Sequence, residues 1–125
     1  MSGAFGEGEG ERTRVRPVET TDASFSREVE EFSGWCVVEF STEWCIPCRM
    51  FSGVVRRAVD PFLSSGACKF VRHDVDRGPA VAERYVVYAV PALCVYFRGG
   101  VRGKLLGYHP EEEVRTFLSR LIGLS

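Results

Sequence analysis

The sequence lacks several features that would place it in common functional classes. Its 125 residues carry a net charge of −1 without a basic stripe, which argues against nucleic acid or an anionic membrane as the main partner. The longest apolar stretch, 85–97, is too short to span a bilayer and contains Pro91. Residues 1–11 have no apolar core of the signal-peptide kind, so secretion is not expected.

Cysteine pairs are also scarce. The chain has five cysteines but only one close pair, so a four-thiolate zinc or cluster site is not expected, and His73 and His109 have no ligand spacing to the cysteines. Cys36, Cys68 and Cys94 lie in apolar, strand-like runs and are expected to be packing residues. A disulfide framework is not needed at this size, so a reducing, cytoplasmic location is the simpler expectation. The chain has no nucleotide-binding fingerprint, and no bound cofactor or metal is expected.

The composition is that of one soluble globular domain. Hydrophobic residues make up 45% of the chain and charged residues 26%. A chain of this length is large enough to bury one hydrophobic core. Residues 1–13 are rich in Gly and Glu and are interpreted as a disordered tail. The domain is therefore expected to cover residues 14–125.

Apolar periodicity predicts the element order β-α-β-α-β-α-β-β-α. The first helix is expected to be capped by Thr21 or Asp22 and to end at Gly34. The second begins at Ile46 and is expected to end at Asp60-Pro61, since proline disfavours helical geometry in the residue before it. The remaining expected helices begin at Pro79 and Pro110, and the expected strands cover 15–18, 35–40, 68–75, 93–97 and 101–106.

The run Trp44-Cys45-Ile46-Pro47-Cys48 is the most informative motif in the chain. It follows an apolar strand and opens a helical pattern, so its two thiols are within disulfide reach of each other. Cys45 lies where the helix dipole and free N–H groups stabilise negative charge, and the thiolate is the reactive form of cysteine. A single Cys-x-x-Cys in such a β-α context predicts a thioredoxin-like redox site.

Glu39 is the most informative charged residue, because it interrupts the apolar strand that leads to this motif. If it is buried, its pKa should rise, and it could exchange a proton with Cys48, through water. The alternative is a glutamate at a strand edge that points to solvent.

From about residue 15 to its end, the chain resembles the thioredoxin family. Glu39 matches the family's buried acid, usually Asp, and Arg72 stands where a lysine commonly faces that acid. Val90-Pro91 matches the family's cis-proline element, and Gly107 matches a glycine that lines the substrate groove. The resemblance implies an α/β thioredoxin fold, with a central mixed sheet flanked by helices on both faces.

The resemblance also implies reduction of protein disulfides, with Cys45 as nucleophile and Cys48 as resolving thiol. The residues implied to contact the substrate are Trp44, Ile46, Pro47, Val90, Pro91 and Gly107, although a core position for Trp44 is almost as well supported. The expected partners are disulfide-containing clients and a thioredoxin reductase that draws electrons from NADPH. Neither nucleic acid nor a membrane is an expected partner, and a monomer is expected.

Three further residues depart from the family pattern. Ile46 replaces the usual glycine between the cysteines, Gly53 replaces a proline, and Ser41 replaces an aromatic residue. These departures leave two alternatives open. The first is a specialised thioredoxin-like protein with one client or a more oxidising role, and the second is a thioredoxin-fold binding subunit.

Overall fold

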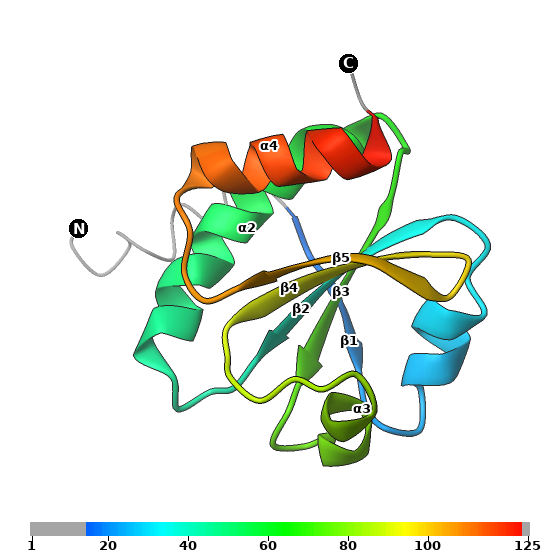
Figure 1. The fold of residues 1–125 in the computed structure, drawn as a ribbon, viewed down its shortest axis with the longest axis vertical. Coiled ribbons are helices and arrows are strands. Elements are labelled where there is room, and N and C mark those ends of the chain that lie inside the picture. Colours follow the sequence, from blue (N-terminus) through cyan, green and yellow to red (C-terminus); the bar gives the residue numbers. More distant parts are fainter. Residues whose placement is uncertain (1–14, 124–125) are drawn as a thin grey trace.

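The computed structural model describes residues 15–123, which form a five-stranded mixed sheet with helices on both faces (Figure 1). The strand order is β1-β3-β2-β4-β5, with β1, β3 and β2 parallel and β4 and β5 antiparallel. The strands are β1 (Val18–Thr20), β2 (Trp35–Ser41), β3 (Lys69–Asp74), β4 (Ala92–Phe97) and β5 (Gly100–Leu106). This arrangement confirms the predicted fold class. The predicted tail, 1–13, and residues 14, 124 and 125 lie outside the described part.

Two long helices, α2 (Ile46–Ser64) and α4 (Glu111–Ile122), cover one face of the sheet. Both are amphipathic, as their apolar spacing predicts. Their buried residues form a single core with the inward side chains of β2, β3 and β4, including Phe51, Val55, Phe62 and Leu118. This layer carries the Cys-x-x-Cys motif, because α2 begins directly after it.

The opposite face is covered by η1 (Ser26–Glu30), a short π-helical segment, and by α3 (Pro79–Arg84). Phe25, Val29 and Val81 pack there against the other side chains of the same strands. Alternate residues of β2 and β4 therefore serve two separate cores, as expected of strands buried on both faces.

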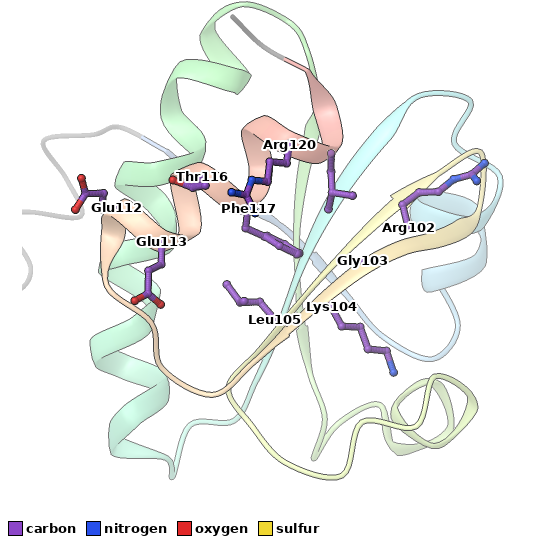
Figure 2. Close-up of a pocket in the computed structure, with 10 residues that line it drawn as sticks. Arg102, Gly103, Lys104, Leu105, Glu112, Glu113, Thr116, Phe117 and Arg120 are labelled. Atoms are coloured by element: carbon purple, nitrogen blue, oxygen red, sulfur yellow. The ribbon is translucent and has the colours of Figure 1, made fainter.

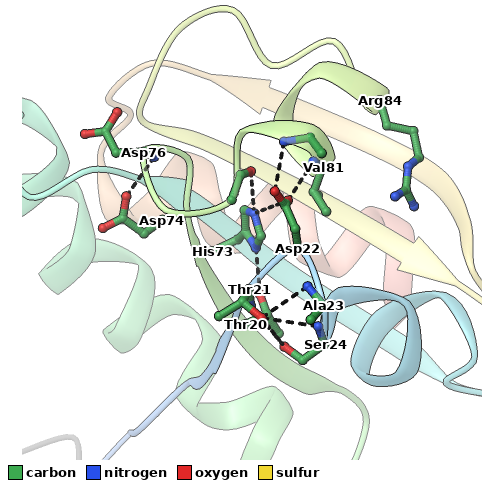
Figure 3. A network of polar contacts seen from close by, with 12 residues as sticks. Thr20, Thr21, Asp22, Ala23, Ser24, His73, Asp74, Asp76, Val81 and Arg84 are labelled. Atoms are coloured by element: carbon green, nitrogen blue, oxygen red, sulfur yellow. Dashed lines mark hydrogen bonds and ion pairs between the residues drawn. The ribbon is translucent and has the colours of Figure 1, made fainter.

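Polar contacts organise this second face (Figure 3). The His73 ring is fully buried, with Nδ1 2.9 Å from the Thr20 hydroxyl and Nε2 2.9 Å from the Gly78 carbonyl oxygen. Asp22 accepts hydrogen bonds from the backbone N–H groups of Ala80 and Val81 at 3.1 and 2.9 Å. Asp22 thus caps α3 rather than the helical segment that follows it in the sequence.

Three predicted elements have boundaries that are wrong by more than one residue. The first strand begins at Val18 instead of residue 15, because Pro17 has no N–H for the ladder and Val15 is buried in the α2–α4 core. The first helix is only the five residues of η1, although Thr21 does accept hydrogen bonds from the N–H groups of Ala23 and Ser24, as a capping residue would.

The third wrong boundary is the end of α2, which continues through Pro61 to Ser64. Proline removes only one hydrogen bond of the helix, near its last turn. Burial of Phe62 on the core side offsets that loss, since a buried phenylalanine contributes about 1.5–3 kcal/mol.

The β4–β5 hairpin turns at Arg98 and Gly99, which have φ values of 52° and 82°. An open groove of about 730 Å³ lies between β5 and α4 (Figure 2), and its apolar lining residues include Leu105, Phe117 and Leu121. None of the residues that line this groove belongs to the predicted redox site, so the groove is a separate feature of the fold.

Candidate redox site

The site is built around the first turn of α2. Cys45 is the N-cap residue, with extended backbone geometry, and its Sγ accepts a hydrogen bond of 3.1 Å from the backbone N–H of Cys48. Pro47 occupies the first turn, where a missing N–H costs nothing. The sulfur of Cys45 therefore occupies the place that a serine or aspartate oxygen takes at other helix starts, and the same N–H groups stabilise a thiolate there.

Cys45 and Cys48 form a disulfide, with their Cα atoms 5.1 Å apart. The two residues differ in access: Cys45 is half-buried, whereas Cys48 is only 2% exposed. A sulfur of another molecule can therefore approach Cys45 but not Cys48. This is the geometry needed for an attacking thiol and an internal thiol that follows it.

The segment before β4 lies against Cys45. The Val90–Pro91 peptide bond is cis, as the resemblance implied, and the Val90 carbonyl oxygen lies 3.8 Å from Cys45 Sγ. The Gly107 N–H donates a 2.8 Å hydrogen bond to the Pro91 carbonyl oxygen, and Gly107 has a φ of 80°. The loop after β5 thus holds the loop before β4 beside the sulfur.

Apolar side chains are exposed around the disulfide. Trp44 is 82% exposed and Ile46 67%, so Trp44 is a surface residue rather than part of the core. Further exposed apolar side chains come from the segments that contact Cys45 or Pro91, namely Met50, Tyr88, Leu106 and Tyr108. Sequence reasoning missed these four: Met50 lies on α2 itself, whereas Tyr88, Leu106 and Tyr108 lie in segments that only the fold brings near it. Exposed apolar side chains grouped in this way are typical of an interaction surface.

Glu39 is fully buried beneath α2, which excludes the solvent-facing alternative. Neither carboxylate oxygen has a hydrogen-bond partner in the described structure. Burial raises the pKa of Glu39 to about 7, while the positive charges of Arg72 and Arg56 oppose that rise. At neutral pH this carboxyl group can therefore either accept or release a proton.

Arg72 lies beside Glu39 on the neighbouring strand, in direct register. Its guanidinium, however, forms its hydrogen bond with Glu19 of β1, at 3.3 Å. The predicted partner of Glu39 thus acts on it through its charge, while its directional contact goes to a different carboxylate.

Two residues of α2 near Glu39 were not predicted. Ser52 and Arg56 follow Cys48 at intervals of four residues, which places all three on one face of the helix. The Arg56 Nε is buried without a hydrogen-bond partner in the described structure. The four-residue spacing from Cys48 was the available signal, but it could not show that this face turns toward Glu39.

The departures from the family pattern lie in different settings. Ser41 is buried, and its hydroxyl has no hydrogen-bond partner in the described structure. Gly53 is half-buried on α2, where an added Cβ would meet only the Arg57 side chain, at 3.5 Å. Ile46 lies exposed next to Cys45 in the sequence, so of these three departures it is the one on the surface at the redox pair.

The remaining cysteines are not arranged for chemistry. Cys36 and Cys94 are buried in the second core, and Cys68 is half-buried just before β3. Burial raises the pKa of Cys36 and Cys68 to about 12 and that of Cys94 to about 11, so these thiols stay protonated. His73 is buried as described above, and His109 contacts Glu113 near the start of α4.

Within residues 15–123, no group of three or more His, Cys, Asp or Glu side chains converges in a way that could hold a metal ion. In the same range, no helix has the length and apolar character required to cross a membrane.

Comparison with known proteins agrees with this geometry. The family model described as Thioredoxin matches residues 16–120. Thioredoxins from the Staphylococcus aureus strains Mu50, MW2 and N315 are each 33% identical to this chain over 103 residues, which is 82% of this chain and 95% of the relative. Residues 16–120, which the family model matches, contain every residue of the site described above.

Proposed function

This chain belongs to the thioredoxin family of thiol–disulfide oxidoreductases, and from that premise we propose that it reduces client disulfides through a Cys45/Cys48 cycle. The observation that carries the proposal is the unequal access of the two sulfurs at the start of α2. Cys45 can be reached from outside, while Cys48 lies next to it inside the protein.

In the first step, the Cys45 thiolate attacks one sulfur of a client disulfide. A bond forms between Cys45 Sγ and that sulfur, the client S–S bond breaks, and the other client sulfur leaves as a thiolate that takes up a proton. The free N–H groups of the first turn of α2 support the attacking charge.

In the second step, the Cys48 thiolate attacks Cys45 Sγ. The Cys45–Cys48 disulfide forms, and the mixed disulfide breaks to release the second client thiolate. Two electrons have then passed from this chain to the client, which leaves as a dithiol. Because the two residues are already held 5.1 Å apart at their Cα atoms, this step needs no large movement.

We propose that Glu39 is the base that accepts the proton of the Cys48 thiol. A thiol becomes an attacking thiolate only when a base takes its proton, and a buried carboxyl group with a pKa of about 7 can do so near neutral pH. Arg72 is proposed as the charge partner, whose positive charge lowers the free-energy cost of ionising the buried Glu39 side chain.

The substrate-contacting residues are proposed to be Trp44, Ile46, Pro47, Val90, Pro91 and Gly107. Their support is the contact of the Val90 carbonyl with Cys45 and the hydrogen bond that joins Gly107 to Pro91. An extended client segment placed along Val90 would bring its disulfide next to Cys45. The exposed rings of Trp44 and Tyr88 extend the apolar surface available to it.

Members of this family need no bound cofactor, and we propose that the electrons reach this chain from NADPH through a thioredoxin reductase. The proposed setting is the cytoplasm, in a monomer that acts on disulfide-containing proteins. Three cysteines outside the pair are free thiols, which is consistent with a reducing compartment.

Reduction of insulin disulfides by the full chain, with dithiothreitol as the electron source, tests the proposed function. The wild-type protein should accelerate insulin reduction, and Cys45→Ser should abolish the acceleration. Cys68→Ser is the matched control, since it removes a thiol outside the site. Equal rates for the wild type and Cys45→Ser would contradict the proposal.

Ile46 favours a second candidate, a reductase restricted to one client or a more oxidising protein, because this bulky exposed side chain lies next to the nucleophile. The reduction potential separates these functions. A value near that of thioredoxin itself, about −270 mV, supports a general reductase. A value nearer to −120 mV, as in strong oxidants of this fold, supports the oxidising role.

A further inference from the structure

Three charged residues form a row across the parallel part of the sheet. Glu19 of β1 is in register with Arg72 of β3, and Arg72 is in register with Glu39 of β2. Residues paired in this way on parallel strands point to the same side of the sheet. Arg72 therefore has one carboxylate on each side of it.

Arg72 makes its hydrogen bond with only one of these two carboxylates. Its Nη1 lies 3.3 Å from Glu19 Oε1, and the side chain of Glu19 is 61% exposed. Glu39, on the inner side, is fully buried, and neither of its oxygens accepts a hydrogen bond in the described structure. The strongest donor in the row is thus held toward solvent, away from the carboxylate that would gain most from it.

We propose that Glu19 is a positioning residue that controls the ionisation of Glu39 by competing with it for Arg72. While Glu19 holds the guanidinium, Glu39 lacks the charge-assisted hydrogen bond that would fix it as a carboxylate. The functional importance of this inference rests on the proposed proton-transfer role of Glu39. The competition between Glu19 and Glu39 for Arg72 can be measured without turnover.

Few other charged groups around Glu39 could control its ionisation. On β4 its paired neighbour is Leu93, which carries no charge. The helix above it carries Arg56 and the Cys45/Cys48 pair, and α4 contributes Val114 and Leu118 to that core. Arg72 opposes the rise in the pKa of Glu39 more strongly than Arg56 does, and Glu19 adds to the rise. Moving Arg72 is therefore the change that should alter this carboxyl group most.

Titration of the Glu39 carboxyl carbon by NMR tests the inference. The full chain is labelled with ¹³C-glutamate and kept in the Cys45–Cys48 disulfide form, so that neither thiol of the pair titrates. The Glu39 signal is identified by its absence in Glu39→Gln. Glu19→Gln should lower the pKa of Glu39 by about one unit, a tenfold change in its ratio of ionised to protonated forms.

Two comparisons separate competition for Arg72 from simple repulsion between the two carboxylates. Glu83→Gln, which removes one exposed negative charge from α3, should leave the Glu39 titration unchanged. In an Arg72→Gln background, Glu19→Gln should lose most of its effect, because no guanidinium remains to be released. Glu19→Asp, which keeps the acceptor charge, should restore most of the wild-type titration.

An unchanged pKa of Glu39 in Glu19→Gln would overturn the inference. So would an equal shift with and without Arg72, since Glu19 would then act by repulsion alone. A wild-type turnover rate in Glu39→Gln would instead overturn the proposed proton relay and leave this control of ionisation in place, because the titration is read without turnover.

Discussion

The two faces of the sheet each bury an ionisable side chain, and they surround it differently. On the η1–α3 face, the His73 ring has a hydrogen-bond partner at each nitrogen. On the α2 face, the Glu39 carboxyl group has no partner at either oxygen, and the Ser41 hydroxyl and Arg56 Nε also lack partners in the described structure. Both side chains are fully buried, so the contrast does not arise from exposure.

The contrast shows where this fold leaves a buried polar group without a hydrogen-bond partner. A buried polar group without a partner costs about 1–3 kcal/mol, and most proteins avoid it. The His73 ring avoids it, as is typical of a structural network, although the buried Tyr96 hydroxyl of the same core has no partner in the described structure. Glu39 carries it beneath α2, the helix that begins at the redox pair, and the proposed proton exchange would use this unpaired carboxyl group. The following predictions test this division between a structural face and a reactive face.

The largest effect should come from the thiols themselves. Cys48→Ser should stop turnover and trap a nearly stoichiometric mixed disulfide between Cys45 and a client, because the resolving thiol is missing. Trapping is measured by non-reducing electrophoresis with a disulfide-containing client. Cys45→Ser is the matched variant and should trap nothing.

If the division between the two faces holds, limited alkylation of the reduced protein should label Cys45 first, and Cys36 and Cys94 only after unfolding. Early labelling of either buried cysteine, read by peptide mapping, would break the division, since those thiols lie on the face assigned to structure.

Glu39→Gln should lower turnover by about 100-fold, at the low end of what general acid–base catalysis contributes. The loss should be greatest near neutral pH, where the carboxyl group of the wild type changes its ionisation. The measurement is the pH profile of insulin reduction. A profile identical to that of the wild type would remove Glu39 from the chemistry.

The same substitution should raise stability at high pH. The pKa of Glu39 lies near 7 in the folded protein, above its ordinary value of 4.5, so the folded state binds this proton more tightly than the unfolded chain does. That stabilisation is fully present below about pH 4.5 and is lost as the pH rises through about 7. Relative to the wild type, Glu39→Gln should therefore gain up to about 3 kcal/mol between pH 4.5 and pH 8 in urea unfolding.

His73→Leu should have the smallest functional effect. It leaves the Gly78 carbonyl oxygen without its ring partner, which should cost about 1–3 kcal/mol of unfolding free energy while insulin reduction at 25 °C stays at the wild-type rate. Urea unfolding and the insulin assay measure the two quantities. His109→Leu, on the surface, should cost less. A large loss of turnover in a stably folded His73→Leu would show that the two faces are not separate.

Local signals predicted most of this architecture. Periodicity located both long helices, and the apolar run at 35–40 located the central strand. These predictions succeeded because helix and strand patterns depend on neighbouring residues. The prediction for Pro61 failed because it used only a local rule, whereas burial of Phe62 in the core extends α2 beyond the proline.

The sequence alone determined the chemistry available at the site: two thiols one helical turn apart, at a helix start whose N–H groups favour a thiolate. Tertiary structure decided which groups meet that pair. Residues distant in the sequence, such as Val90 and Gly107, reach the site only through loop contacts, and Arg72 lies between Glu19 and Glu39 only because three strands align in register. The physical reason is that strand register and loop packing depend on contacts between distant segments, which no local pattern encodes.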